Sequence, residues 1–248
     1  MPVLDQPVVG VSGITVATSD VHSTREAWSR FAGAPEADSL VVGGLVVGVS
    51  PARGGPEGLT GVTLSVENVS AFARLLQRRG LRLDGTTLEL GGLTWRLAGT
   101  TGVHRRRGHD AGDIDGIDHV VVESSDPERA VALYGARLGL DLRLDRTMPR
   151  HRMRGLFFRC GQAVLEVITR LDDEGTVRGA PGVPDAFGGL AWRVPDVGVV
   201  RDRLMGDGVD VSEVREGRKP GTQVATVHDP ELVVPTLLIG APADGSED

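Results

Sequence analysis

An arginine and a lysine stand side by side in the segment EGRKPGT, residues 216–222. Arg218 offers a planar fork of hydrogen-bond donors and Lys219 offers a compact point charge, a combination suited to holding a carboxylate or a phosphate. The Pro220–Gly221 step that follows is typical of a tight turn, which would fix the direction of both side chains. The pair is therefore a candidate anion clamp, and the alternative is an ordinary charged hairpin.

Other patterns that carry chemistry are missing or weak. Cys160 is the single cysteine, so the chain can form no intramolecular disulfide and no thiolate metal cluster. It precedes a turn glycine and has no base motif beside it, which favours a small buried residue over a nucleophile. No Ser-His-Asp pattern is present, and GGLVVG lacks the lysine that a phosphate-binding loop needs.

The composition excludes several classes of protein. At 248 residues the chain has the length of two domains, and 40% apolar residues suffice for packed cores. Its apolar runs reach about six residues, far below the roughly 20 of a membrane span, and the first residues show no signal peptide, so we expect a cytoplasmic protein. The net charge of −7 argues against nucleic acid as a partner. All basic residues except Lys219 are arginine, which indicates a GC-rich, bacterial genome.

A change of composition divides the chain. Residues 100–115, TTGVHRRRGHDAGDID, have no apolar period and concentrate glycine, arginine, histidine and aspartate, as an exposed connection does. We therefore expect an N-terminal domain at 1–100, a linker at 101–115, a C-terminal domain at 116–240 and a disordered tail at 241–248. His104 and His109 fall in the linker, where exposure to solvent explains them with fewer assumptions than metal binding.

The two halves repeat one pattern. SDVHSTREAWSRFAG (19–33) and SDPERAVALYGARLG (125–139) share an opening Ser-Asp and a glycine at the same distance. Asp20 and Asp126 suit the N-cap of a helix, and Pro127 suits its first turn. A second pair of segments, 61–81 and 189–209, aligns without a gap, and each ends a helix at a glycine. Four strand-helix units are thus predicted.

Short, alternating, β-branched segments follow each helix, so the repeated unit is β-α-β-β-β. Only 27 residues lie between Gly33 and Gly61, against 49 between Gly139 and Gly189. The first unit therefore has room for about two strands after its helix instead of three. We predict an α+β fold of two tandem domains built from paired βαβββ units, the N-terminal domain being the abbreviated copy.

The paired units resemble the vicinal oxygen chelate superfamily, which includes glyoxalase I, extradiol dioxygenases, methylmalonyl-CoA epimerase and the fosfomycin and bleomycin resistance proteins. The resemblance is carried by IDHVVVESSDPERAVALYGARLGLDL and GLAWRVPDVGVVRDRLMGDGV in residues 116–240, and more weakly, through the internal repeat, by 11–99. It implies cupped mixed sheets with helices outside and a ligand cavity in the C-terminal cup. In metal-dependent members the ligands lie on the first, fourth, fifth and eighth strands of a domain.

Carried over position by position, the resemblance implies half of a metal site. The first-strand ligand matches His119 and the fourth-strand carboxylate matches Glu166. The fifth-strand position falls on Gly189 and the eighth-strand position on Thr236, and neither binds a divalent ion as imidazole or carboxylate does. The N-terminal half offers Gly61 and the stretch LTWRL at the matching places. We therefore expect either no cofactor or a weakly held divalent metal.

Two roles remain for the surviving pair. His119 and Glu166 bind a metal with help from His151, His228 or a substrate, or they are polar residues of a pocket, bonded to each other or to a ligand. A carboxylate beside an imidazole can also do general acid/base work without a metal.

The resemblance implies lyase, isomerase or epimerase chemistry on a small oxygenated, anionic organic molecule, with His119 and Glu166 as catalytic residues. Activation of oxygen by iron is disfavoured because Gly189 and Thr236 break the ligand set that it needs. The alternative is a metal-free binding protein like the resistance proteins that sequester a drug. The partner is then a small molecule, and the chain is a monomer or homodimer. The candidate ligand contacts are Arg218, Lys219, Arg154, Trp192 and Phe158.

Overall fold

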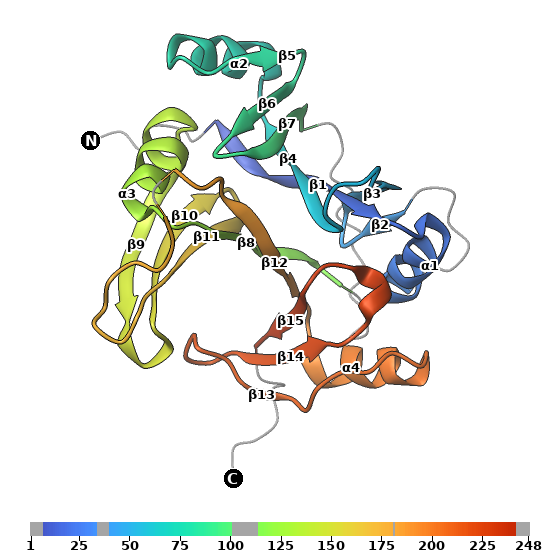
Figure 1. Cartoon of the computed structure of the whole chain (residues 1–248). Helices are drawn as coiled ribbons and strands as arrows, with labels where there is room; N and C mark the ends of the chain where they lie inside the picture. The colour runs from blue at the N-terminus through green and yellow to red at the C-terminus, as the bar shows by residue number, and fades with distance from the viewer. Residues whose placement is uncertain (1–6, 34–39, 101–113, 181, 242–248) are drawn as a thin grey trace. The chain divides into compact units, whose positions relative to one another are not determined.

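A computed structural model of the chain describes residues 7–33, 40–100, 114–180 and 182–241. Its strands form two mixed sheets, of seven and eight strands, accompanied by few helices (Figure 1). The predicted α+β fold of tandem, cupped, paired βαβββ units is confirmed. Most of the expected linker, with His104 and His109, and all but the first residue of the expected tail lie outside the described residues.

Each of the four βαβββ repeats is called a module from here on. The seven-stranded sheet is built from the first two modules and has the order β2-β3-β1-β4-β7-β6-β5. The first module consists of β1 (Val8–Thr18), α1 (Val21–Ala32), β2 (Val41–Val42) and β3 (Leu45–Pro51). The second consists of β4 (Gly58–Val66), α2 (Val69–Arg78), β5 (Leu83–Asp84), β6 (Thr87–Leu90) and β7 (Leu93–Gly99). Within the described residues the first module has two strands after its helix, as its length predicted.

The eight-stranded sheet is built from the other two modules and has the order β13-β14-β15-β12-β8-β11-β10-β9. The third module consists of β8 (Gly116–Glu123), α3 (Pro127–Ala130), η1 (Val131–Arg137), β9 (Asp141–Met148), η2 (Pro149–His151), β10 (Met153–Cys160) and β11 (Ala163–Arg170). The fourth consists of β12 (Ala186–Arg193), α4 (Val197–Gly206), β13 (Arg215–Glu216), β14 (Gln223–Val227), η3 (Pro230–Leu232) and β15 (Thr236–Gly240).

Contacts divide the chain into two compact units that cut across the order of the modules. Unit 1 comprises Met1–Gly13, Thr60–Thr101 and His119–Gly188, and unit 2 comprises Ile14–Leu59, Gly102–Asp118 and Gly189–Asp248. Unit 1 thus takes most of the second and third modules, and unit 2 most of the first and fourth.

All four helices begin and end with the signals that the repeat indicated. In each, the N-cap side chain accepts a hydrogen bond from the backbone N–H three residues later, at 2.8 to 3.0 Å. The caps are Asp20, Asn68, Asp126 and Asp196. The glycines after the helices, whose φ values lie between 69° and 87°, adopt the left-handed conformation that glycine tolerates best. These are Gly33, Gly80, Gly139 and Gly208.

The third helix differs from the expected α-helix in its second half. Only Pro127–Ala130 is α-helical, and Val131–Arg137 is a π-helix in which Leu138 N–H reaches the carbonyl of Leu133 at 2.8 Å. Residues at four-residue spacing are buried in this segment, a pattern that both helix types produce. The spacing of hydrophobic residues in the sequence therefore could not distinguish an α-helix from a π-helix here.

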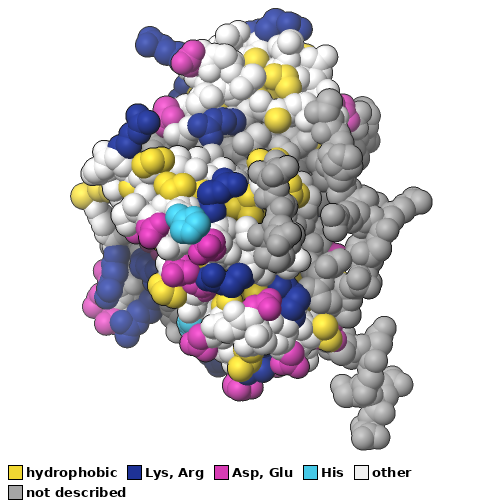
Figure 2. All heavy atoms as spheres, turned by 90° about the vertical axis from the view of Figure 1, so that its right-hand side faces the viewer, with side chains coloured by type: hydrophobic (Ala, Val, Ile, Leu, Met, Phe, Trp, Pro, Cys, Tyr) yellow, Lys and Arg dark blue, Asp and Glu magenta, His cyan; other side chains and the backbone are white. Residues whose placement is uncertain are grey.

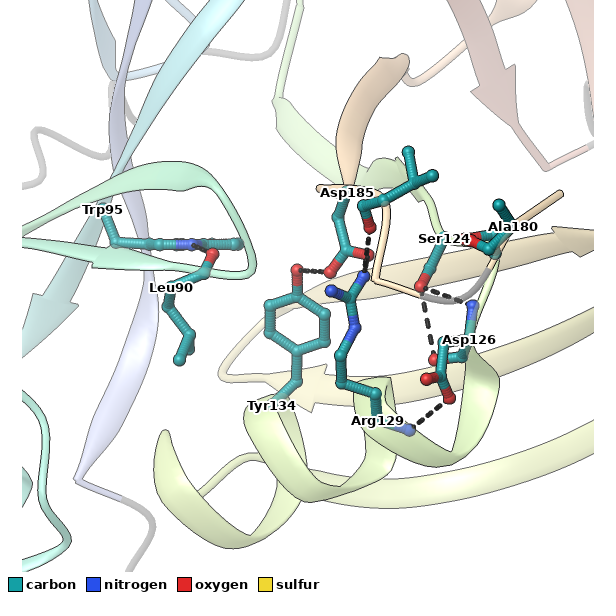
Figure 3. Close-up of polar contacts among 10 residues, drawn as sticks. Leu90, Trp95, Ser124, Asp126, Arg129, Tyr134, Ala180 and Asp185 are labelled. Atoms are coloured by element: carbon teal, nitrogen blue, oxygen red, sulfur yellow. Dashed lines mark hydrogen bonds and ion pairs between the residues drawn. The ribbon is translucent and has the colours of Figure 1, made fainter.

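A buried carboxylate ties the connection between β11 and β12 to this helix (Figure 3). The side chain of Asp185 is fully buried, and its two oxygens lie 2.6 Å from Arg129 Nη2 and 2.7 Å from Tyr134 Oη. Arg129 also donates to the carbonyl of Val183 at 2.7 Å. Burial raises the pKa of the Tyr134 phenol far above its usual value, so Tyr134 remains a hydrogen-bond donor. The turn after β6 approaches so closely that a Cβ on Gly91 would meet Asp185 Oδ2 at 2.5 Å.

Each unit has its own cluster of buried aromatic rings. In unit 1, Trp95 of β7 lies 5.8 Å from Tyr134 and 5.6 Å from Phe187, measured between ring centroids. In unit 2, Trp28 of α1 lies 5.8 Å from Trp192 of β12. The aromatic residues of the two repeated helices therefore pack against strands.

The surface mixes both signs of charge. Figure 2 shows lysine and arginine side chains interspersed with aspartate and glutamate over the face drawn there. Across the described part of the chain, every helix is too short or too polar to cross a membrane.

We predict that Asp185→Ala lowers the free energy of unfolding by about 3 kcal/mol, because it leaves the buried Tyr134 hydroxyl and the part-buried Arg129 guanidinium without their acceptor. Urea denaturation followed by circular dichroism measures the change. The control is Asp84→Ala, on the exposed end of β5, which should change stability by less than about 0.5 kcal/mol. Equal stability of the two variants would contradict the anchoring role of Asp185.

Candidate functional site

His119 and Glu166 lie in contact on neighbouring parallel strands of unit 1. β8 and β11 pair with His119 opposite Val164 and Glu166 opposite Val121. Alternate side chains of a strand point to opposite faces, so His119 and Glu166 project from the same face, one row apart. His119 Nε2 lies 3.3 Å from Glu166 Oε2, and the side chains are 18% and 13% exposed. The two residues that the resemblance singled out thus form one polar pair.

The pair lies on the face that the helices leave uncovered. On β11, Leu165, Val167 and Thr169 point to the other face and are buried. That face contacts α3, and η1 packs beside it on β9 and β10 (Figure 1). We call the uncovered side of β8 to β11 in unit 1 the cup face. On β11 this face carries the side chains open to a ligand, because the alternate residues Leu165, Val167 and Thr169 are buried.

An apolar floor adjoins the pair on the cup face. Phe157 of β10 lies opposite Glu166, and Gly155 lies opposite Ile168 of β11. A Cβ on Gly155 would meet the ring of Phe157 at 2.9 Å and the methyl group of Met148 at 3.1 Å, so both side chains lie over this glycine. The floor therefore consists of an aromatic ring beside the Glu166 carboxylate and of aliphatic groups beside Ile168.

An ion pair lies further along the same two strands. Arg170 Nη2 lies 2.9 Å from Glu123 Oε1, and the two side chains are 65% and 46% exposed. By strand alternation Glu123 shares the face of His119, and Arg170 shares the face of Glu166. On β8 and β11 the cup face thus has a sheltered polar pair and an exposed charged pair, and the register adds the exposed Arg159 of β10 and Arg146 of β9 to the same face.

The position of His119 is a glycine in the other three modules. His119 stands seven residues before the helix N-cap of its module, and Gly13, Gly61 and Gly189 stand at the same distance before theirs. For Gly61 and Gly189 this agrees with the sequence alignment. The imidazole is therefore present in one module of four.

The counterpart of Glu166 in the fourth module is Leu237, one residue beyond the position that we had aligned. Glu166 faces the residue two beyond His119 on β8. The residue two beyond Gly189 on β12 faces Leu237 on β15. We had placed Thr236 there, and a shift of one residue moves a side chain to the opposite face of the sheet.

Thr236 is turned toward the buried side of its sheet. It is 3% exposed, and its hydroxyl donates to the carbonyl of Val234 at 2.8 Å. In the second module the same register brings Arg96 to the position of Glu166, opposite Thr63. Neither leucine nor arginine binds a divalent metal as a carboxylate does.

At the aligned positions, the described residues do not fit a four-ligand metal shell. The third module supplies one imidazole and one carboxylate, and the aligned positions elsewhere supply glycine, leucine and arginine. Within the described residues no three His, Cys, Asp or Glu side chains are grouped so that they could hold a metal ion. His151 and His228, which we had considered as helpers, are exposed side chains of η2 and of the segment after β14.

Arg154 lies on the helix side of the sheet and not among the ligand contacts that we expected. Its Nε and Nη2 donate to Asp145 at 2.9 and 2.8 Å, and its Nη1 donates to Glu128 of α3 at 2.7 Å. These hydrogen bonds raise the pKa of Arg154, and those from Arg154 lower the pKa of Asp145. Arg154 therefore braces β9 and β10 against α3.

Phe158 and Trp192 offer no surface to a ligand, which corrects two further expectations. Both are fully buried. The ring of Phe158 lies 6.2 Å from Tyr134 beneath the helix, and the ring of Trp192 lies 5.8 Å from Trp28. The preceding residue of the strand, Phe157, takes the cup-face position because adjacent residues of a strand point to opposite faces.

Arg218 and Lys219 are exposed on the loop between β13 and β14, in unit 2. The expected turn is present: Gly221 has a φ of 70°, and Thr222 Oγ1 donates to the carbonyl of Lys219 at 2.6 Å. A role of these residues as an anion clamp remains a prediction.

Our reading of the sequence missed Phe157 as the aromatic residue of the cup face, and it missed Arg170 and Glu123. A simple signal was available, since counting every second residue outward from Glu166 reaches Arg170, and counting from His119 reaches Glu123.

Comparison with known proteins bears on the same region. Residues 118–226 match the family model described as Glyoxalase/Bleomycin resistance protein/Dioxygenase superfamily, and this range contains both His119 and Glu166.

Three solved structures show the same fold. A mutant of 4-hydroxymandelate synthase from Streptomyces coelicolor is 13% identical, with 96% of this chain and 94% of that chain covered and a TM-score of 0.72. BphC, a halotolerant catechol dioxygenase, is 14% identical, with 98% and 91% covered and a TM-score of 0.69. The Mn(II)-bound glyoxalase from Novosphingobium aromaticivorans is 14% identical, with 94% and 82% covered and a TM-score of 0.67. At these identities the likeness concerns the fold.

We predict that Cys160 does not react in the folded protein. Its side chain is buried, and burial raises the pKa of the thiol to about 12. At pH 8 the thiolate is then about 1,000-fold scarcer than for a free cysteine. Iodoacetamide labelling followed by mass spectrometry should modify the chain in guanidinium chloride and leave the native protein unmodified. Native labelling at the denatured rate would contradict the burial.

Proposed function

We propose that residues 118–226, which match the family model of the Glyoxalase/Bleomycin resistance protein/Dioxygenase superfamily, make this protein a member of the vicinal oxygen chelate superfamily that its sequence resembles. On this premise we propose that the protein acts on a small oxygenated organic molecule by proton transfer, in a lyase, isomerase or epimerase reaction. His119 and Glu166 are the catalytic residues of this proposal. The observation that carries it is their 3.3 Å contact on the cup face.

The contact supplies what a proton-transfer site needs. An imidazole both accepts and returns a proton, and a carboxylate in contact with it fixes the ring and offsets the charge that appears when the ring is protonated. Both side chains are sheltered but still accessible, at 18% and 13% exposure, so a bound substrate can reach them while most water is kept away.

The reaction that fits is removal of a proton from a carbon next to a carbonyl group. His119 takes the proton and Glu166 stabilises the imidazolium that forms. Return of the proton to the face from which it was taken restores the carbon, delivery of a proton to the opposite face inverts it, and return to the neighbouring position isomerises the substrate. The step consumes no oxidant, and all its atoms stay with the substrate or on His119.

A second function is favoured by the apolar floor. Phe157 and Met148 beside the polar pair give the cup face the character of a small-molecule binding surface, which would hold a ligand without changing it. The protein would then sequester its ligand in the manner of the bleomycin resistance proteins. Oxygen-activating chemistry is not proposed, because the aligned positions Gly189 and Leu237 supply no ligand for a metal triad.

Further parts of the proposal concern the setting of the site. We infer a division into domains at 1–100 and 116–240, joined by a linker at 101–115 and followed by a tail at 241–248. We also infer a cytoplasmic location, a monomer or homodimer, and a small-molecule partner without nucleic acid. The Arg218–Lys219 clamp belongs to this group of proposals.

We predict that His119→Asn and Glu166→Gln each slow the exchange of substrate C–H protons with solvent by about 10²-fold to 10⁴-fold. The assay follows deuterium incorporation from D₂O into pyruvate, 2-oxobutyrate and hydroxyacetone by ¹H NMR. The control is His228→Asn, an exposed histidine of unit 2, which should exchange at the wild-type rate. Wild-type rates in both site variants would contradict proton transfer, and binding without exchange in the wild-type protein would favour sequestration.

We predict that the protein retains less than about 0.1 divalent metal ion per chain after desalting, because a single imidazole and carboxylate leave most ligand positions to water. Elemental analysis of protein grown with added manganese, iron and zinc measures the content. One tightly held ion per wild-type chain that is lost in Glu166→Ala would contradict the prediction and place a metal at the polar pair.

A further inference from the structure

The arginines on the two faces of the third module are held differently. On the helix side, Arg129 and Arg154 each donate to two different residues and are 27% and 25% exposed. On the cup face, Arg170 is 65% exposed and lies 2.9 Å from Glu123, which is itself 46% exposed. The helix-side arginines are therefore structural, whereas Arg170 stands at the surface on which we place the ligand.

The contact between Arg170 and Glu123 is easily exchanged. Ion pairs between exposed side chains contribute little to stability because water screens them and the side chains lose freedom. A guanidinium group presents two parallel N–H donors to a carboxylate, so an incoming carboxylate can replace Glu123 at small cost. Glu123 stays nearby and repels a doubly charged phosphate more than a singly charged carboxylate.

The distance between the two polar regions sets the length of a ligand. Four residues of an extended strand separate Glu166 from Arg170 on β11, and four separate His119 from Glu123 on β8, which is about 13 Å. On β11 the position between them is apolar, and Arg146 of the edge strand β9 lies beyond it, opposite Gly155. This apolar position is Ile168, which is 7% exposed, and it adjoins the floor made by Phe157 and Met148 over Gly155.

We propose that the cup face of unit 1 selects an elongated carboxylic acid. Its oxygen-bearing end meets His119 and Glu166, its apolar middle lies along Ile168 and Phe157, and its carboxylate is held by Arg170 in exchange for Glu123. The proposal rests on the proposed function for the role of the first end, and it deepens that function by naming the class of substrate.

The test compares a carboxylate with its neutral amide. Isothermal titration of the full chain with 8-hydroxyoctanoate and with 8-hydroxyoctanamide should show the acid binding at least about tenfold more tightly, as a hydrogen bond to a charged partner predicts. Arg170→Ala should remove this preference by weakening the acid alone, and Arg170→Lys should keep part of it. Because Arg170 is exposed, its variants should keep the thermal midpoint of the wild-type protein.

Two controls make the result specific. Arg78→Ala removes an exposed arginine at the end of α2 in unit 1 and should leave the preference unchanged. The shorter 4-hydroxybutanoate cannot reach both ends of the cup face, so it should bind more weakly than 8-hydroxyoctanoate in the wild-type protein.

Three results would overturn the proposal: equal binding of the acid and the amide to the wild-type protein, an unchanged preference in Arg170→Ala, or no binding of the acid at millimolar concentration. The His119→Asn variant separates this inference from the proposed function. If it keeps the preference for the acid while wild-type protein shows no proton exchange, anion recognition stands and proton transfer fails.

Discussion

The strands of this protein can offer only every second side chain to a ligand, because helices bury the others. On β11 this constraint assigns Leu165, Val167 and Thr169 to the core and leaves Glu166 on the cup face. The same alternation on β8 brings His119 within 3.3 Å of Glu166. It also separates the neighbours Phe157 and Phe158, one facing the cup and one buried under the helix. The chemistry of the site thus follows from which face each strand position occupies.

The helix that enforces this division in the third module is anchored by polar contacts, of which those of Asp185 are buried. Asp185 joins Arg129 and Tyr134 to the connection that leads from β11 into β12. Arg154 joins the start of the same helix to β9. These contacts lie on the face opposite the polar pair, so they hold the strands in register without occupying the cup face. Arginine therefore has two roles in one module, as a structural brace on one side and as a candidate recognition group on the other.

The four modules show how a repeated architecture can keep its shape while its chemical groups change. All four retain a capped helix and a terminal glycine, because these determine whether the chain folds. The position of His119 is glycine in the other three modules, and the position of Glu166 is Leu237 in the fourth and Arg96 in the second. A pair that remains in one module alone is suited to moving a proton, and less suited to holding a metal ion.

The sequence by itself determined the α+β class, the four modules, their helix caps and the shortened first module, since these depend on local signals such as Asp20, Asp126 and the spacing of glycines. It also singled out His119 and Glu166, through a family resemblance. Only the tertiary structure decided which residue of a strand faces the cup, placing Leu237 and not Thr236 opposite the cup position of β12, and Phe157 and not Phe158 beside Glu166. It also decided that Arg154 is a brace and that Val131–Arg137 is a π-helix. The physical reason is that strand register and burial depend on partners distant in the chain, such as Asp185 for Tyr134. A shift of one residue changes the local sequence pattern little, but it moves every side chain of the strand to the opposite face.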